Sequence, residues 1–164
     1  LQRHRPETST KLMRIDQTEL EEILKQHWDL LLRSLKTLQQ SREKTQVYLN
    51  KTDLNFEELE SIDSLTSKFG RTSDIYLQKV LRTVWLLLRE DTVPLIDLLN
   101  RAEKLMMILS ANQLLQMRDI RNQITHEYLP EAAPELALEV NRKTEQLAQN
   151  IEQTERFLRQ RDWL

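Results

Sequence analysis

Residues 20–38 read LEEILKQHWDLLLRSLKTL, and their apolar side chains recur every three or four positions. The recurring positions are Leu20, Leu24, Trp28, Leu31, Leu35 and Leu38. Because an α-helix turns once in about 3.6 residues, this spacing places them all on one face of a long helix. The stretch therefore predicts an amphipathic helix that begins at a capping pair, Asp16 and Glu19, and continues to about Tyr48.

The composition of the whole chain indicates the same fold class. The chain has 164 residues, of which one is glycine, four are proline and 30% are charged. So few turn-forming residues, beside many Leu, Glu, Gln, Lys and Arg, predict an all-helical protein. The length suits one domain, so we expect a single helical-bundle domain over residues 16–164. Residues 1–15 show no apolar periodicity and are expected to form a flexible tail.

A second helical segment follows a polar turn. Asn55 and Glu58 form a cap-like pair, which predicts a helix over about 56–90. The only glycine of the chain, Gly70, predicts a break in this helix, since glycine commonly ends helices. Residues 75–88 are apolar over more than half of the helix circumference. We expect this part to be buried on several sides or to meet another chain.

The rest of the chain predicts two more helical segments. Pro94 suits a first helical position, and Ser110 with Gln113 marks a restart or jog before the helix continues to about Tyr128. A final helix extends to a basic end at 156–161. Four long amphipathic helices joined by short turns predict an antiparallel up-and-down four-helix bundle.

Charge and cysteine content restrict the possible functions. The formal net charge is −2, so binding of RNA must depend on a local basic cluster rather than on bulk charge. The chain has no cysteine, which excludes disulfides, thiolate catalysis and thiolate metal sites. No run of 18 apolar residues suggests a membrane helix. We therefore expect a soluble cytoplasmic protein that has no membrane partner.

One helical segment carries polar side chains where its pattern predicts apolar ones. Its apolar stripe comprises Leu114, Met117, Ile124 and Tyr128. Arg121 completes this stripe, and a buried guanidinium without a partner is costly. Arg121 must therefore pair with a carboxylate, reach solvent or face a polar pocket. Arg118, Asn122 and His126 follow at four-residue spacing on a neighbouring ridge, so the end of this helix is suited to bind an anion.

The pattern Arg121-Asn122-x3-His126-x-Tyr128 resembles the Arg-Asn-x3-His-x-Tyr motif of HEPN domains, in the form found in HepT-like toxins of HEPN/MNT toxin–antitoxin pairs. The resemblance implies a helical homodimer that cleaves RNA without a metal or cofactor, with the Arg and His of both protomers lining one cleft. It also implies a partner, an MNT-type nucleotidyltransferase antitoxin. In such pairs the tyrosine equivalent to Tyr128 is adenylylated, which blocks the cleft.

The chemistry of these residue types suits RNA cleavage by a ribose 2′-hydroxyl. Histidine exchanges protons near neutral pH, so His126 is the candidate general acid or base. Arg121 is the candidate for stabilising charge on the phosphate, and Asn122 for orienting the imidazole or a phosphate oxygen. In an ideal helix, Arg121 and His126 point about 140° apart. They converge only if the last turn is distorted or if a second copy of the chain contributes to the site.

Alternative interpretations remain open at this stage. Lys68 and Arg71, like Arg118, could contact RNA, or Lys68 and Arg71 could simply be solvated. Arg121 could pair with a carboxylate on another helix, and His126 could interact with the helix C-terminus, while Tyr128 only packs. The chain would then be a catalytically inactive HEPN module that binds nucleotide or serves as an accessory subunit of a nucleotidyltransferase, or a plain helical interaction protein.

Overall fold

A computed structural model describes residues 16–126 and 133–164, and these residues form helices and turns without any strand. The elements are α1 (Gln17–Thr45), a 3₁₀ turn η1 (Gln46–Tyr48), α2 (Phe56–Asp74), a π-helix η2 (Ile75–Val80), α3 (Leu81–Leu87), α4 (Leu95–Lys104), α5 (Ala111–His126) and α6 (Ala133–Arg159). The all-helical prediction is thus confirmed for this part of the chain. The predicted tail, 1–15, lies outside the described residues.

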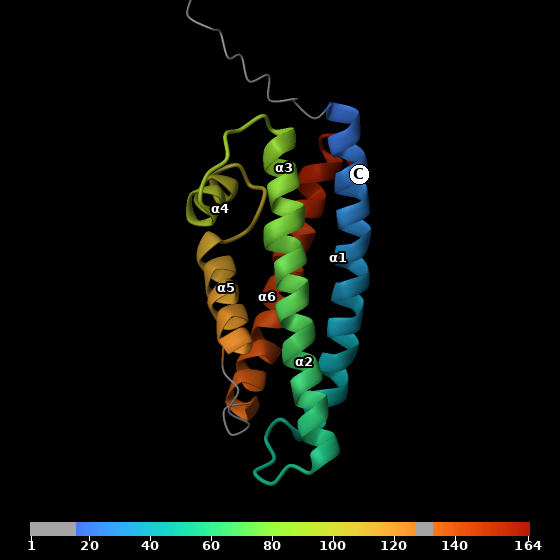
Figure 1. The fold of residues 1–164 in the computed structure, drawn as a ribbon, viewed down its shortest axis with the longest axis vertical. Helices are drawn as coiled ribbons and strands as arrows, with labels where there is room; N and C mark the ends of the chain where they lie inside the picture. The colour runs from blue at the N-terminus through green and yellow to red at the C-terminus, as the bar shows by residue number, and fades with distance from the viewer. Residues whose placement is uncertain (1–15, 127–132) are drawn as a thin grey trace, which may run out of the picture.

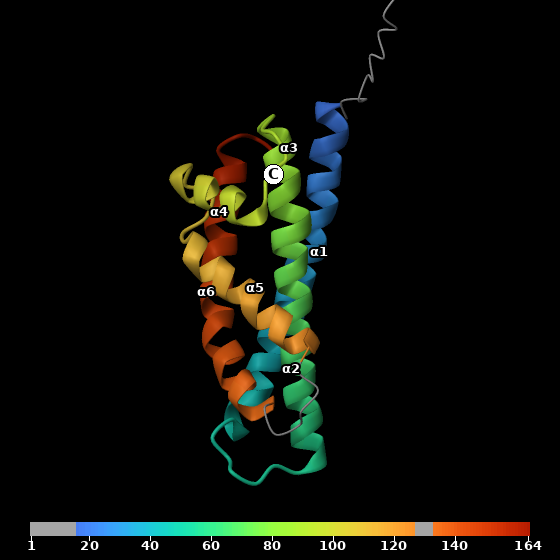
Figure 2. The same ribbon diagram turned by 60° about the vertical axis from the view of Figure 1, so that its left-hand side comes forward.

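The long helices lie side by side with alternating direction. α1 is followed by the continuous rod of α2, η2 and α3, which returns along it, and α5 and α6 complete the assembly (Figures 1 and 2). The short helix α4 lies across the long ones, so the predicted third helix is divided into α4, a turn and α5. α4 ends at Lys104 because Met106 takes a left-handed backbone conformation with φ of 61°.

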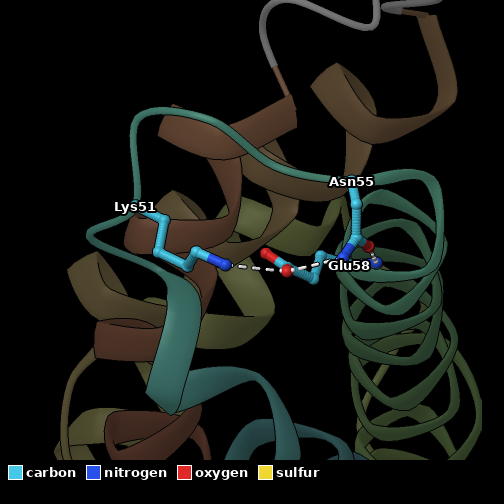
Figure 3. Close-up of polar contacts among 3 residues, drawn as sticks. All are labelled: Lys51, Asn55 and Glu58. Atoms are coloured by element: carbon cyan, nitrogen blue, oxygen red, sulfur yellow. Dashed lines mark hydrogen bonds and ion pairs between the residues drawn. The ribbon is translucent and has the colours of Figure 1, made fainter.

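The start of α2 is fixed by side chains, as the sequence predicts. Asn55 Oδ1 accepts a hydrogen bond from Glu58 N at 2.9 Å, and Asn55 Nδ2 donates to Glu58 Oε1 at 2.9 Å (Figure 3). Lys51 Nζ donates to the same carboxylate oxygen at 2.8 Å (Figure 3). The bond to Asn55 Oδ1 satisfies a helix-end N–H group that has no partner within the helix, and the other two contacts hold the Glu58 carboxylate beside it. The predicted restart is also confirmed, since Gln113 N donates to Ser110 Oγ at 3.2 Å.

One continuous apolar core runs through the described helices. The predicted face of α1 is buried at every position: Leu20, Leu24, Trp28, Leu31, Leu35 and Leu38. The apolar excess of 75–88 is also explained within the chain, because its apolar side chains pack into or against the same core except Leu86, which is 43% exposed. Within residues 16–126 and 133–164, no helix combines the length and apolar character needed to cross a membrane.

The predicted helix break near Gly70 is wrong. α2 continues through this residue, which is buried and does not adopt a positive φ. Glycine ends a helix when it takes the left-handed conformation, and here the helical conformation persists. A Cβ at this position would lie 3.8 Å from Arg121 Cγ and 3.9 Å from Ile124 Cδ1, which are ordinary contacts. The irregularity of the rod is instead the π-helix η2, which begins at Ile75.

A buried polar network ties the rod to α6 and to the turn after α4. Tyr76, which belongs to η2 and is fully buried, places its Oη 2.6 Å from Thr154 Oγ1. Asn150, also fully buried, accepts hydrogen bonds at Oδ1 from Leu109 N at 3.0 Å and Ser110 N at 3.2 Å. Burial raises the pKa of the Tyr76 phenol, which remains neutral, although the contact with Thr154 acts in the opposite direction. This network fixes the position at which α5 begins.

Candidate anion-binding groove

A solvent-open groove of about 540 Å³ lies between α5 and the rod of α2 and η2. Its lining comprises Arg71, Asp74, Ile75, Leu77, Gln78, Lys79, Arg118, Arg121 and Asn122. The structure thus brings together four of the residues that the sequence singles out: Arg71, Arg118, Arg121 and Asn122. It brings them together from two helices that are distant in the sequence.

The apolar face of α5 determines which side chains point into the groove. Leu114, Met117 and Ile120 are buried and hold α5 against the core. Ile120, rather than Arg121, therefore continues the buried stripe after Met117, and the predicted stripe member Ile124 packs against the core while partly buried. Arg121 lies at the edge of this face, with its side chain 36% exposed. Only its aliphatic part packs inward, and the guanidinium remains accessible from the groove.

Arg121 forms an ion pair with the carboxylate of Asp74. Its Nε and NH2 groups both lie 2.9 Å from the same oxygen, Oδ2 of Asp74. The Asp74 side chain is 42% exposed, and ion pairs at such exposure contribute only about 0.2–1 kcal/mol. The third guanidinium nitrogen, NH1, donates to Asn122 Oδ1 at 3.4 Å. A multiply charged anion can therefore compete with Asp74 for this guanidinium at little cost.

Cations outnumber carboxylates among the lining residues. The groove has four cationic lining residues, Arg71 and Lys79 from the rod and Arg118 and Arg121 from α5, and one carboxylate, that of Asp74. Arg118 also approaches Asp119 at 3.4 Å, but that carboxylate is 64% exposed on the outer side of α5. Guanidinium groups bind phosphate oxygens in pairs through their planar fork. The groove therefore favours a phosphate-bearing ligand electrostatically.

The π-helix adds a cation that sequence reasoning missed. Asp74 and Lys79 are five residues apart, which in a regular α-helix points their side chains about 140° away from each other. In η2 the backbone bonds join residues five apart, as Leu81 N does to Tyr76 O. This wider turn brings Lys79 to the same side as Asp74, and both line the groove. No local signal in the sequence marks a π-helix, so Lys79 and Gln78 could not be predicted.

Lys79 also affects a histidine that is not part of the groove. His27 is half-buried, and its Nδ1 lies 3.2 Å from Thr83 Oγ1. Thr83 Oγ1 donates its proton to Lys79 O at 2.7 Å, so the imidazole acts as the donor to Thr83. Burial lowers the pKa of His27, and the nearby charge of Lys79 lowers it further, against a smaller opposing effect of a backbone hydrogen bond at Lys79.

The other predicted site residues lie elsewhere. His126 is the last residue of α5, is exposed, and is absent from the described lining of the groove. α5 is helical from Ala111 to His126, so Arg121 and His126 stay about 140° apart around it. Lys68 lines a different groove, between α1 and α2. Tyr128 lies outside the described residues.

Among the residues that the structure describes, no group of three or more His, Cys, Asp and Glu side chains is placed to hold a metal ion. Comparisons with family models, curated proteins and solved structures found no match to this chain. The functional proposal therefore depends on the motif and on the geometry of the groove.

Proposed function

We propose that this chain is a HEPN-type, metal-independent endoribonuclease, the toxin of a HEPN/MNT toxin–antitoxin pair that acts in the cytoplasm as a homodimer. The observation that carries the proposal is the convergence of Arg71, Lys79, Arg118 and Arg121 with Asn122 in one open groove. Such a groove attracts an RNA backbone although the chain as a whole is slightly acidic. The proposed fold is the HEPN-like antiparallel four-helix bundle, with α4 as an added crosswise helix.

In the proposed reaction, the ribose 2′-oxygen attacks the adjacent phosphorus and the bond to the 5′-oxygen breaks. The products are a 2′,3′-cyclic phosphate and a 5′-hydroxyl. A general base takes the 2′-hydroxyl proton, and a general acid gives a proton to the leaving oxygen; His126 serves in these transfers. Arg121 leaves Asp74 to stabilise the charge on the phosphorane, and Asn122 holds a phosphate oxygen or orients the imidazole.

The proposed site requires two copies of the chain. The regular course of α5 keeps His126 away from Arg121 within one chain. In a two-fold dimer, each groove receives the imidazole of the partner subunit, and the two sites are equivalent. This arrangement satisfies the geometric requirement without distortion of the last helical turn.

The experiment is RNA cleavage in the presence of a metal chelator. Arg121→Ala and His126→Ala are each expected to lower kcat/KM by about 100-fold or more. Arg101→Ala is the matched control, since Arg101 is exposed on α4, outside the groove. Mixing the two inactive variants should restore part of the activity, because a mixed dimer holds one complete site. Full activity of either single variant, or no cleavage by the wild-type protein, would overturn the proposal.

The proposed regulation involves Tyr128 and a nucleotidyltransferase antitoxin. Transfer of an adenylyl group to this tyrosine would place a bulky, negatively charged nucleotide close to the motif, where it repels RNA. Protein produced together with its antitoxin should carry the mass of one adenylyl group and should not cleave RNA. The variant Tyr128→Phe should remain unmodified and active under the same conditions. Unmodified but inhibited protein would instead indicate inhibition by contact.

A second candidate function is supported by one observation, the Arg121–Asp74 pair, which neutralises the central cation of the groove. In this alternative the chain is a catalytically inactive HEPN module that binds nucleotide or serves as an accessory subunit of a nucleotidyltransferase. It predicts nucleotide binding that depends on Arg71 and Lys79, together with no RNA cleavage at any protein concentration. The cleavage assay above separates the two candidates.

A further inference from the structure

Arg71 lines two grooves rather than one. The second groove, of about 710 Å³, lies between α1 and α2. Its lining comprises Thr37, Gln40, Ser41, Lys44, Glu57, Glu60, Ser61, Ser64, Lys68 and Arg71. None of these lining side chains is apolar, so the groove is unsuited to an apolar ligand or to the apolar face of a helix. Its hydroxyl, amide and charged groups suit a strongly hydrated, hydrogen-bonding ligand.

The two grooves meet at the exposed face of α2 that carries Arg71. At about 100° per residue, Lys68 and Asp74 lie about 60° to either side of Arg71 on the helix. Lys68 accordingly lines the α1–α2 groove and Asp74 lines the groove beside α5. Arg71 lies between them, is exposed, and contributes to both. An extended ligand can therefore pass from one groove to the other across a single guanidinium.

The charges in the α1–α2 groove are ordered along its length. α1 and α2 pack side by side and run in opposite directions, with Ser34 Oγ 2.7 Å from Thr72 Oγ1 near one end (Figure 1). Lys68 therefore lies at the end near Arg71, whereas Glu57 and Glu60 lie about 12–17 Å further along α2. The basic end, with Lys68 and Arg71, adjoins the candidate site. Because α1 runs in the opposite direction, Lys44 lies at the far end, where it is outnumbered by Glu57 and Glu60.

We propose that the α1–α2 groove is a second RNA subsite, which binds the segment of single strand that continues from the scissile phosphate. Arg71 binds the phosphate that crosses α2, and Lys68 binds the next one. Ser61, Ser64 and Gln40 are placed to donate hydrogen bonds to ribose oxygens and to bond base edges, and 2′-O-methylation leaves these groups in place. At the far end Glu57 and Glu60 outnumber Lys44, and this net negative charge repels further phosphates, so the subsite holds only a few nucleotides. The inference rests on the proposed function and names the part of the substrate that this surface recognises.

The test measures binding of fluorescent 2′-O-methyl oligonucleotides of increasing length, which lack the attacking hydroxyl and are not cleaved. For the wild-type protein, affinity should rise with length and then level off once the α1–α2 groove is filled. Ser64→Tyr fills this groove with a ring, and Lys68→Gln removes a phosphate contact. Each should weaken binding of the longer oligonucleotides about tenfold and leave the shortest unchanged. Ser67→Tyr, at an exposed position of α2 outside both grooves, and Lys104→Gln, on α4, are the matched controls.

Thermal unfolding of each variant shows whether it is folded, and RNA cleavage is measured in parallel. Cleavage by the wild-type protein without length-dependent affinity, or affinity unchanged by both Ser64→Tyr and Lys68→Gln, would overturn the subsite and leave the ribonuclease proposal intact. Length-dependent binding that Ser64→Tyr abolishes, without cleavage, would support the subsite and overturn the ribonuclease proposal. Absence of any RNA binding would overturn both.

Discussion

Two polar clusters flank the same π-helix, and they differ in burial and in how well their groups are paired. On one side, Tyr76 and Asn150 are fully buried and bonded to Thr154 and to the turn after α4. On the other side, Arg121 holds a single oxygen of Asp74 and both side chains are more than one third exposed. The first cluster has its partners within the chain, whereas the second can exchange its partner for a ligand.

The difference shows how a structural polar cluster is distinguished from a candidate functional one. A buried group that loses its partner cannot turn to water, so a buried network holds one conformation. An exposed pair gains little from its contact and loses little when it opens. The sequence draws attention only to the exposed cluster, because Arg121 and Asn122 stand in a recognisable motif while Asn150 and Thr154 lie in an ordinary helical repeat.

The largest expected effect is the loss of stability when the buried cluster of Tyr76, Asn150 and Thr154 is disrupted. Asn150→Ala removes the acceptor of Leu109 N and Ser110 N and should lower the free energy of unfolding by about 2–4 kcal/mol. Arg121→Ala should lower it by less than about 1 kcal/mol, because its ion pair is exposed. Urea unfolding monitored by circular dichroism measures both. Gln149→Ala, an exposed neighbour on α6, is the control. Equal losses for Asn150→Ala and Arg121→Ala would remove the distinction between the two clusters.

A smaller effect, on RNA affinity, is expected when the exposed pair of Arg121 and Asp74 is changed. Asp74→Asn removes the only carboxylate among the described lining residues, and should raise affinity for non-cleavable RNA about fivefold. Fluorescence anisotropy at fixed salt measures the affinity. Asp63→Asn, an equal charge change at an exposed position of α2 outside the groove, should have little effect. Equal gains in both variants would mean that overall charge, rather than the groove, determines binding.

A change beneath the groove tests the corrected role of Gly70. Because the helix continues through this residue and a Cβ meets only ordinary contacts, Gly70→Ala should raise the free energy of unfolding by about 0.5–1 kcal/mol. Urea unfolding measures the gain, and RNA affinity should be unchanged. A loss of stability would show that α5 cannot accommodate the added methyl group beside Arg121.

The smallest expected effect concerns His27. Its pKa is lowered on folding, so the unfolded chain binds a proton more readily and part of the stability is lost as pH falls from about 6.5 through the folded pKa. Urea unfolding at several pH values should therefore show a slightly steeper loss for the wild-type protein than for His27→Gln. Identical pH dependence of the two proteins would contradict the assigned effect of burial and of Lys79.

Much of the fold is predictable because it follows from local patterns. The face of α1 and the caps at Asn55 and Ser110 are set by residues close in sequence, and the structure confirms them. The prediction of a helix break near Gly70 was wrong because it assumed that a glycine ends the helix. In this chain, residues other than glycine take the left-handed conformation after helices: Arg89 with φ of 59° and Met106 with φ of 61°. When the rest of the fold imposes the left-handed conformation on a residue other than glycine, the residue type does not reveal the helix end.

The candidate site was predictable only in part. The motif singled out Arg121 and Asn122, and four-residue spacing added Arg118. Lys79 joins them through the π-helix, and the ion pair with Asp74 depends on how α5 packs against α2. Both depend on packing between segments distant in the sequence, so a local pattern cannot reveal them. The relation of Arg121 to His126 stays a prediction, since it depends on a second copy of the chain.

The most direct test of the contrast between the two clusters is nuclear magnetic resonance of side-chain N–H groups during titration with a non-cleavable RNA. If the exposed pair exchanges Asp74 for phosphate, the Arg121 Nε–H resonance should shift with saturation, while the Asn150 Nδ2 resonances stay in place. An unchanged Arg121 resonance at saturating RNA, or shifts of equal size in both clusters, would contradict the account.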